Sequence, residues 1–139
     1  MTDQQQPTVE DVMAVADFRA ALRQFLRRSE RIARQSGLTP QRHLLLMMIK
    51  GSPDAAEQST VTELSDRLQL AQSTVTELVR RAEEAGLIER EQSQRDARVA
   101  HLRLSPEGER RLMLSFTDLS DEREQLRDAF AHLADGGQA

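Results

Sequence analysis

Residues 69–105 constrain the fold more than any other stretch, because the period of their hydrophobic pattern changes partway along. In the first half, apolar side chains recur at i, i+3, i+4 and i+7, the spacing of one face of a helix; they are Val75, Leu78, Val79 and Ala82. In residues 100–104 the period becomes two, which indicates a half-buried strand. The segment therefore predicts a helix followed by a strand of alternating pattern.

The residues between these two patterns predict how they are joined. Gly86 follows the helix at the position where a left-handed residue commonly ends it. Leu87-Ile88 then begins an apolar strand, and residues 92–98 form a polar, charged tip before residues 100–104. Helix, strand, hairpin tip and strand in this order predict the recognition helix and wing of a winged helix-turn-helix. Thr62 or Val61 begins the expected first helix of that motif.

Three short motifs in this stretch resemble the MarR family of bacterial transcriptional regulators. They are STVT at residues 73–76, AGLIER at residues 85–90, and DAR at residues 96–98 followed by LRLSPEG at residues 102–108. The resemblance covers residues 38–112 by motif, and it covers the flanking helices only by position and amphipathicity. It implies a winged-helix DNA-binding lobe within a two-fold dimer. Ala71 and Glu77 depart from the family, which often has a small polar residue and an arginine at these positions.

The bulk composition suits one helix-rich domain over residues 1–139. The net charge of −4 does not advertise nucleic-acid binding, but a DNA footprint is a local patch of charge. The absence of cysteine excludes disulfides and a thiol-based oxidant sensor. No apolar run approaches the ~18 residues of a membrane span, and the N-terminus lacks a signal-peptide layout. These features predict a cytoplasmic protein that does not enter a membrane.

The expected fold class is mainly α with a small β-wing. Residues 38–105 would form the winged helix-turn-helix lobe, and residues 8–36 and 106–134 would form dimerisation helices. Residues 60–61 are a candidate third strand. Ser105 is the expected N-cap of the helix after the wing, since Pro and Glu follow it. The C-terminal region is either one bent helix or two.

The terminal helices carry apolar faces for which the lobe offers no partner. A monomer would expose them, at a cost of ~25 cal/mol per Å² of apolar surface. We therefore expect a homodimer sealed by these helices. The residues predicted to make the seal are Phe18, Leu22, Phe25, Leu126, Phe130 and Leu133.

The N-terminal turn of a recognition helix reaches base edges in the major groove, and a wing reaches the backbone or a minor groove. Gln can bond adenine bidentately, whereas Ser and Thr can reach bases or phosphates. Each such residue singly is ordinary helix surface, but their joint placement before a wing favours binding of double-stranded DNA. Asp96 and Arg98 can also brace the wing tip against each other. The candidate DNA contacts are Gln72, Ser73, Thr74, Thr76, Arg80, Arg95 and Arg98.

A ligand pocket is the second candidate site, beside an apolar helix at residues 44–49. The MarR resemblance implies a crevice there that takes aromatic compounds, so a small aromatic acid is the expected effector. A Met-rich buried helix is also ordinary core, and that alternative stays open. The candidate pocket residues are Phe25, Arg42, His43, Met47 and Met48.

Metal binding and catalysis are not predicted. The three histidines, His43, His101 and His132, are far apart and lack the paired spacing of a zinc site. No phosphate-binding glycine loop and no nucleophile–base pair is present, so no cofactor is expected and the chain is not expected to be an enzyme. Arg23, Arg27 and Arg31 form a stripe on the first helix, which is more simply a solvated face than a phosphate site.

The sequence thus predicts a sequence-specific DNA-binding regulator that acts as a repressor and works as a homodimer on a pseudo-palindromic operator. The alternative is a winged-helix dimer that serves as a protein-interaction module without an operator of its own. Net acidity and Glu77 favour this alternative. The discriminating feature is whether Arg80, Arg90, Arg95 and Arg98 lie clear of acidic partners.

Overall fold

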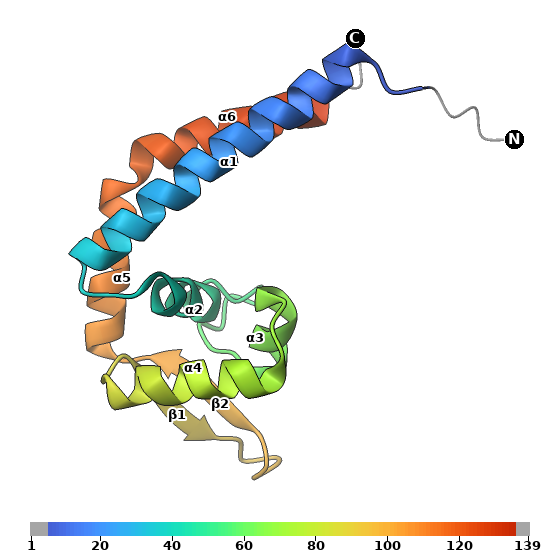
Figure 1. Ribbon diagram of the computed structural model, residues 1–139. Coiled ribbons are helices and arrows are strands. Elements are labelled where there is room, and N and C mark those ends of the chain that lie inside the picture. The colour runs from blue at the N-terminus through green and yellow to red at the C-terminus, as the bar shows by residue number, and fades with distance from the viewer. Residues whose placement is uncertain (1–5, 136–139) are drawn as a thin grey trace, which may run out of the picture. The chain divides into compact units, whose positions relative to one another are not determined.

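The computed structural model describes residues 6–135, and Figure 1 shows its elements in chain order. They are α1 (Val9–Gln35), α2 (Pro40–Lys50), α3 (Val61–Leu68), α4 (Gln72–Glu84), β1 (Ile88–Gln92), β2 (Ala100–Leu104), α5 (Pro106–Asp118) and α6 (Ser120–Asp135). The mainly helical fold with one two-stranded antiparallel sheet confirms the expected fold class. The C-terminal region is two helices, which settles the open alternative.

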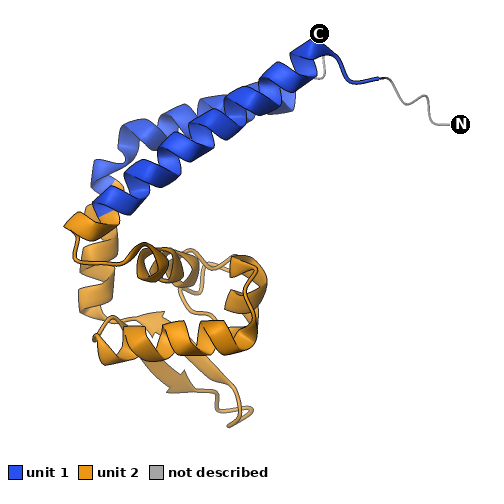
Figure 2. Cartoon of the chain, in the orientation of Figure 1, with its two compact units in different colours: residues 1–32, 117–139 blue, residues 33–116 orange. Residues whose placement is uncertain are grey.

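The chain divides into two compact units, coloured separately in Figure 2. One comprises residues 33–116, here called the lobe, and the other residues 1–32 with 117–139, here called the helical arm. The boundaries fall inside α1 and α5 rather than at the helix ends that the sequence suggested. The description of residues 1–139 as a single domain stays a prediction.

The lobe has a continuous apolar core drawn from all of its helices and both strands. Its fully or almost fully buried members include Leu45, Leu46, Ile49, Leu64, Val75, Val79, Leu87, Leu102 and Leu112. The α4 residues among them lie at the helical spacing predicted from the sequence. Their burial fixes which face of α4 points inward and leaves the opposite face to solvent.

The wing is an antiparallel hairpin in which Ile88 pairs with Leu104 and Gln92 with Ala100. The candidate third strand at residues 60–61 is wrong. A single bridge forms one residue earlier, between Ser59 and Leu102, with Ser59 N donating to Leu102 O at 3.0 Å. Thr60 instead caps α3, because its hydroxyl accepts from Glu63 N at 3.2 Å and its own N–H donates to the Glu63 carboxylate. The capping box therefore prevents the strand from continuing.

Gly86 ends α4 as the sequence predicted. Its φ of +75° lies in the left-handed region, and Leu87 N donates back to Ala82 O at 3.0 Å. The turn between α3 and α4 uses the same conformation at a residue less suited to it, Gln69, whose φ is +55°. Gln69 N donates to Asp66 O, and its side-chain amide donates to the same carbonyl.

The start of α5 is locked to the end of α4 by Ser105, the predicted N-cap. Its hydroxyl accepts from Gly108 N at 3.0 Å and donates to Gly86 O, while Ser105 N donates to Leu87 O at 2.9 Å. A Cβ on Gly108 would lie 2.2 Å from Leu87 O. Only glycine permits this approach of α5 to the residue that precedes β1.

The helical arm pairs α1 with α6. Phe18 of α1 packs edge-on against Phe130 of α6, with ring centroids 6.1 Å apart, and the Arg28 guanidinium lies 3.3 Å from the Glu122 carboxylate. Thr8 caps α1 reciprocally with Asp11, and two acidic residues lie in the first turn of the helix. In the part of the chain that the structure describes, no helix is long and apolar enough to cross a membrane.

Candidate nucleic-acid interface

The exposed surface of α4 and the wing tip of the hairpin both belong to the lobe, and Figure 1 shows α4 beside β1 and β2. Ala71, with extended backbone, stands at the N-cap of α4 and makes no side-chain capping bond. The apolar face of α4 is buried, so its first turn presents only its polar face. Helix N-termini leave amide donors unsatisfied, which favours an acceptor from outside the chain.

The four residues predicted to read bases lie together on that exposed face. They are Gln72, Ser73, Thr74 and Thr76, and all are exposed in the lobe. Gln72 Nε2 lies 3.4 Å from Thr62 Oγ1 of α3, a long contact that a better acceptor can replace. All four are thus accessible from outside the lobe, and their roles at a DNA groove stay a prediction.

Arg80, the fifth predicted contact on α4, is held by acidic neighbours on its own helix. Its Nε donates to Glu77 Oε2 at 3.0 Å, its Nη1 pairs with Glu84, and Arg81 Nε lies 3.1 Å from Glu77 Oε1. Hydrogen bonds from Arg80, and then from Arg81, lower the pKa of Glu77 to about 2. Glu77 is therefore a carboxylate at every pH at which the protein would meet DNA.

The wing tip is organised around Asp96. Its Oδ1 accepts from Arg98 N at 3.0 Å and lies 3.3 Å from Arg98 Nε, while Val99 N donates to Asp96 O. The Arg98 side chain is nevertheless 92% exposed. Arg95 is exposed as well, and among the described residues no acidic side chain forms an ion pair with it. The tip thus presents two accessible guanidinium groups.

Acidic residues of the wing strands, Glu89 and Glu91, lie close enough in sequence to the wing arginines to weaken a basic patch, but their pairing with Arg103 was not predicted. Arg103 lies 3.6 Å from Glu89 and 3.4 Å from Glu91, and Arg90 lies 2.8 Å from Glu83. The signal was available, because the hairpin register places Arg103 directly opposite Glu89. Cross-strand pairs of opposite charge are an ordinary way to stabilise a two-stranded ribbon.

Three of the four arginines named as the discriminating feature, Arg80, Arg90 and Arg98, therefore do have acidic partners. Their side chains are 54%, 42% and 92% exposed, respectively. Ion pairs between such exposed groups contribute only ~0–1 kcal/mol each. Phosphate oxygens make charge-assisted bonds of at least that strength with guanidinium groups, so the pairs weaken a DNA footprint without abolishing it.

The candidate ligand-pocket residues fall in both units. Phe25 belongs to the helical arm, whereas Arg42, His43, Met47 and Met48 belong to α2 of the lobe. His43 is buried and its Nε2 lies 2.8 Å from Ser115 Oγ, which itself donates to Leu112 O. His43 must then donate through Nε2, and burial lowers its pKa. It is a poor candidate to meet a carboxylate, and Arg42 remains the cation of this group.

No group of three or more metal-ligating side chains comes together in residues 6–135.

The predicted dimerisation residues all lie in the helical arm. Phe18, Leu22, Phe25, Leu126 and Leu133 are half-buried there, and Phe130 is 60% exposed. Further apolar side chains are exposed along α1, including Val9, Val12, Met13 and Leu26. Within one chain the arm thus leaves much of its apolar surface in water.

Comparison with known proteins agrees with this architecture. The family model described as MarR family matches residues 36–99. The chain is 33% identical over 125 residues to the uncharacterized HTH-type transcriptional regulator YsmB of Bacillus subtilis (strain 168), covering 87% of this chain and 81% of the relative.

Two solved structures extend the likeness. A MarR family protein from Bacillus stearothermophilus has a TM-score of 0.70 at 27% identity, covering 84% of this chain and 79% of its own. Streptococcus pneumoniae FabT, solved in complex with DNA, has a TM-score of 0.57 at 26% identity, covering 66% of this chain and 61% of its own. The chain therefore belongs to the MarR family of winged helix-turn-helix transcriptional regulators.

Proposed function

We propose that the protein is a homodimeric repressor that places the first turn of each α4 in the major groove of a pseudo-palindromic operator. The observation that carries this proposal is the exposed polar turn of α4 in the same lobe as the two accessible arginines of the wing tip. The complex of FabT with DNA supports the same use of the fold. In a two-fold dimer the half-sites would lie about one helical turn, ~10 bp, apart.

Each part of the interface has a distinct role in the proposal. Gln72, Ser73, Thr74 and Thr76 read base edges, whereas Arg95 and Arg98 bind the backbone or enter a minor groove. Asp96 stabilises the tip by accepting a hydrogen bond from the Arg98 backbone N–H. The Arg98 guanidinium would leave Asp96 and bind a phosphate. Repression follows if the bound dimer occludes a promoter.

The dimer in this proposal is sealed by the helical arm. Its support is the exposed apolar surface of α1 and α6, including Leu26 at 49% and Phe130 at 60% exposure. Val12, Val15 and Ala16 also line an apolar hollow of about 380 Å³ near the start of α1. A second copy is the partner that the MarR architecture offers for such a surface.

Relief of repression by a small aromatic acid is the finer part of the proposal. Met47 and Met48 are half-buried and adaptable, and Arg42 is a partly accessible cation on the same helix. A ligand there regulates DNA binding only if it binds one arrangement of the dimer better than the other. A thermal-shift screen of aromatic acids followed by operator competition tests it. Hits that raise Tm but leave operator affinity unchanged would overturn the regulatory role.

The experiment that tests the main proposal is selection of binding sites from fragmented genomic DNA with the purified protein. The expected result is an enriched inverted repeat with centres ~10 bp apart. Affinity for this repeat should fall steeply as salt increases, because binding releases counterions from the DNA phosphates. If no motif is enriched at physiological salt, the proposal is overturned in favour of a protein-interaction module. The ion pairs of Arg80 and Arg90 with acidic residues already favour that alternative.

A further inference from the structure

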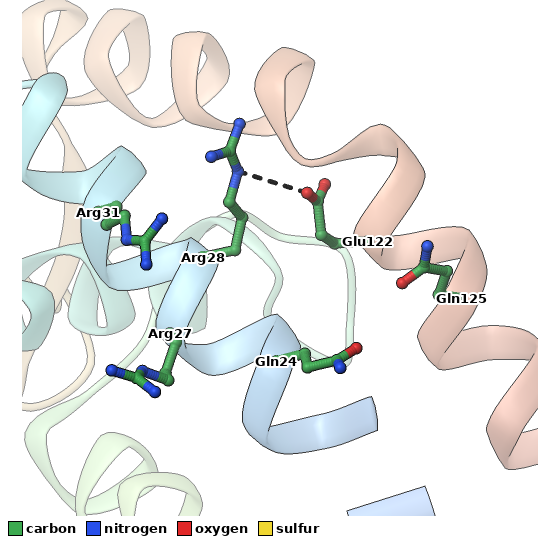
Figure 3. Close-up of a pocket in the computed structure, with 6 residues that line it drawn as sticks. All are labelled: Gln24, Arg27, Arg28, Arg31, Glu122 and Gln125. Carbon is green, nitrogen blue, oxygen red and sulfur yellow. Dashed lines mark ion pairs between the residues drawn. The ribbon is translucent and has the colours of Figure 1, made fainter. Parts of the chain in front are cut away.

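A polar hollow of about 370 Å³ lies in the helical arm, between α1 and α6 (Figure 3). Its lining residues are Gln24, Arg27, Arg28 and Arg31 of α1 and Glu122 and Gln125 of α6. All six are polar or charged, which sets this hollow apart from the apolar one near the start of α1. The lining holds three guanidinium groups and one carboxylate.

The one carboxylate of the lining is already engaged. Glu122 Oε1 lies 3.3 Å from Arg28 Nε, as the dashed line in Figure 3 shows. Arg27 and Arg31 form no ion pair with any acidic side chain of the described residues. They stand at i and i+4, where side chains are neighbours ~5–6 Å apart at Cβ and like charges repel. The hollow therefore carries an excess of positive charge that nothing within the described arm neutralises.

On α1, the exposed apolar flank that carries Leu26 faces away from two arginines of the hollow. At ~100° per residue along α1, the exposed Leu26 lies about 160° around the helix from Arg28 and about 140° from Arg31. Val15 and Leu22 lie on the same flank as Leu26. A second copy that covers this flank of α1 would leave Arg28 and Arg31 accessible.

We propose that this hollow binds a small polyanion carrying two or more carboxylate or phosphate groups. Arg27 and Arg31 are its charge-bearing ligands, because each planar guanidinium can hold a carboxylate or phosphate bidentately. The Gln24 and Gln125 amides offer neutral donors from either side of the hollow. The site at α2 is lined by two methionines and one cation, whereas this hollow carries three guanidinium groups, so the two proposed sites differ in place and in ligand class.

The test uses full-length protein, with citrate and pyrophosphate as probes, in titration calorimetry at constant ionic strength maintained with KCl. The expected result is saturable binding of at least one probe. Arg27→Gln and Arg31→Gln should each weaken it about tenfold or more, as expected for loss of a hydrogen bond between charged groups. Arg23→Gln is the matched control, because it removes one charge from the same arginine stripe outside the hollow, and it should change affinity less than about twofold.

Glu122→Gln provides a second, opposite test. It removes the negative charge from the hollow and releases Arg28, so it should tighten binding of the same probe; an unchanged or weaker affinity would contradict a site at this place. The proposal is also overturned if neither probe binds beyond the KCl control, or if Arg23→Gln weakens binding as much as Arg27→Gln and Arg31→Gln. None of these measurements contains DNA, so their failure would leave the proposed regulation untouched.

Discussion

At the residue scale, His43 links the stability of the lobe to pH. Its imidazole is buried, its Nε2 donates to Ser115 Oγ, and burial lowers its pKa below the ordinary value of 6.5. The unfolded chain therefore takes up a proton here more readily than the folded chain does. Stability contributed by neutral His43 is fully present above about pH 6.5 and is lost as pH falls toward the lowered pKa.

We predict that the free energy of unfolding decreases between about pH 7 and pH 5 with a slope of up to ~1.4 kcal/mol per pH unit from this residue. His43→Gln keeps an N–H donor for Ser115 but does not titrate, and it should remove this part of the slope. Urea unfolding of both proteins across the range measures the difference. His101 and His132 remain in both proteins, so parallel curves would refute the role of His43.

Glu77 is the second residue whose chemistry leads to a prediction. Its carboxylate lies on the exposed side of α4, which is the side proposed to face DNA, and accepts hydrogen bonds from both Arg80 and Arg81. Glu77→Gln should release Arg81, leave Arg80 paired with Glu84 alone, and remove a charge that repels phosphate. We expect about three- to tenfold tighter binding to DNA of random sequence, and a salt dependence steeper by about one counterion for each protomer. Fluorescence anisotropy across a salt series measures both.

Glu107 gives a closely matched control for Glu77. It pairs with Arg110 and Arg111 at the same helical spacings, and its pKa is likewise lowered to about 2, but it lies on α5. Glu107→Gln changes net charge by the same amount and should leave DNA binding almost unchanged. Equal effects of the two substitutions would mean that overall charge, and not the face of α4, controls affinity.

At the scale of elements, the pattern of residues 69–105 was sufficient to predict α4, the hairpin and their order. The predictions succeeded because the signals were local: helical spacing in Val75 to Ala82, a glycine at the left-handed position, and alternation in β2. The third strand failed because Ser59 finds its partner, Leu102, far along the chain. Local propensity at Thr60 could not reveal that pairing, although the capping box with Glu63 was visible.

Two glycines at the junction between α4, β1 and α5 are required for different reasons, one for backbone conformation and the other for close approach of two backbones. Gly86→Ala meets open space, so its cost is conformational only, about 1–2 kcal/mol. Gly108→Ala drives a Cβ to 2.2 Å from Leu87 O, a backbone atom held by Ser105. It should cost more than ~3 kcal/mol or prevent folding. Chemical denaturation ranks the two, and equal losses would contradict the close-approach account.

The candidate site could be predicted in outline but not in its charge balance. Gln72 to Thr76 and the wing arginines follow from helix phase and hairpin position alone. The pairs of Arg80 with Glu77 and Glu84 were also within reach, at i−3 and i+4. The Arg28–Glu122 pair and the hollow beside it join residues from opposite ends of the chain, so no local pattern indicates them.

At the scale of the whole molecule, the apolar residues of the helical arm connect folding with assembly. Several of them are exposed in a single chain, although Phe18 and Phe130 contact each other within it. Deletion from Asp121 onward removes α6 and the partner of Phe18. We predict a monomeric, aggregating or largely unfolded product, judged by light scattering after size exclusion and by thermal melting. A well-behaved monomer with a cooperative melt would contradict the coupling.

In the proposed complex, α4 reads the DNA sequence while the wing supplies charge. The ratio of the affinity for the operator to the affinity for DNA of random sequence separates these two roles. This ratio should be measured by anisotropy for wild type, Gln72→Ala and Arg95→Ala on the selected operator and on a scrambled duplex. We predict that Gln72→Ala lowers this ratio by a factor that corresponds to ~1–3 kcal/mol for each base pair that Gln72 contacts. Arg95→Ala should weaken both duplexes alike and reduce the salt slope by about two, because the dimer loses one phosphate contact in each protomer. A wild-type protein that binds both duplexes equally would contradict the account.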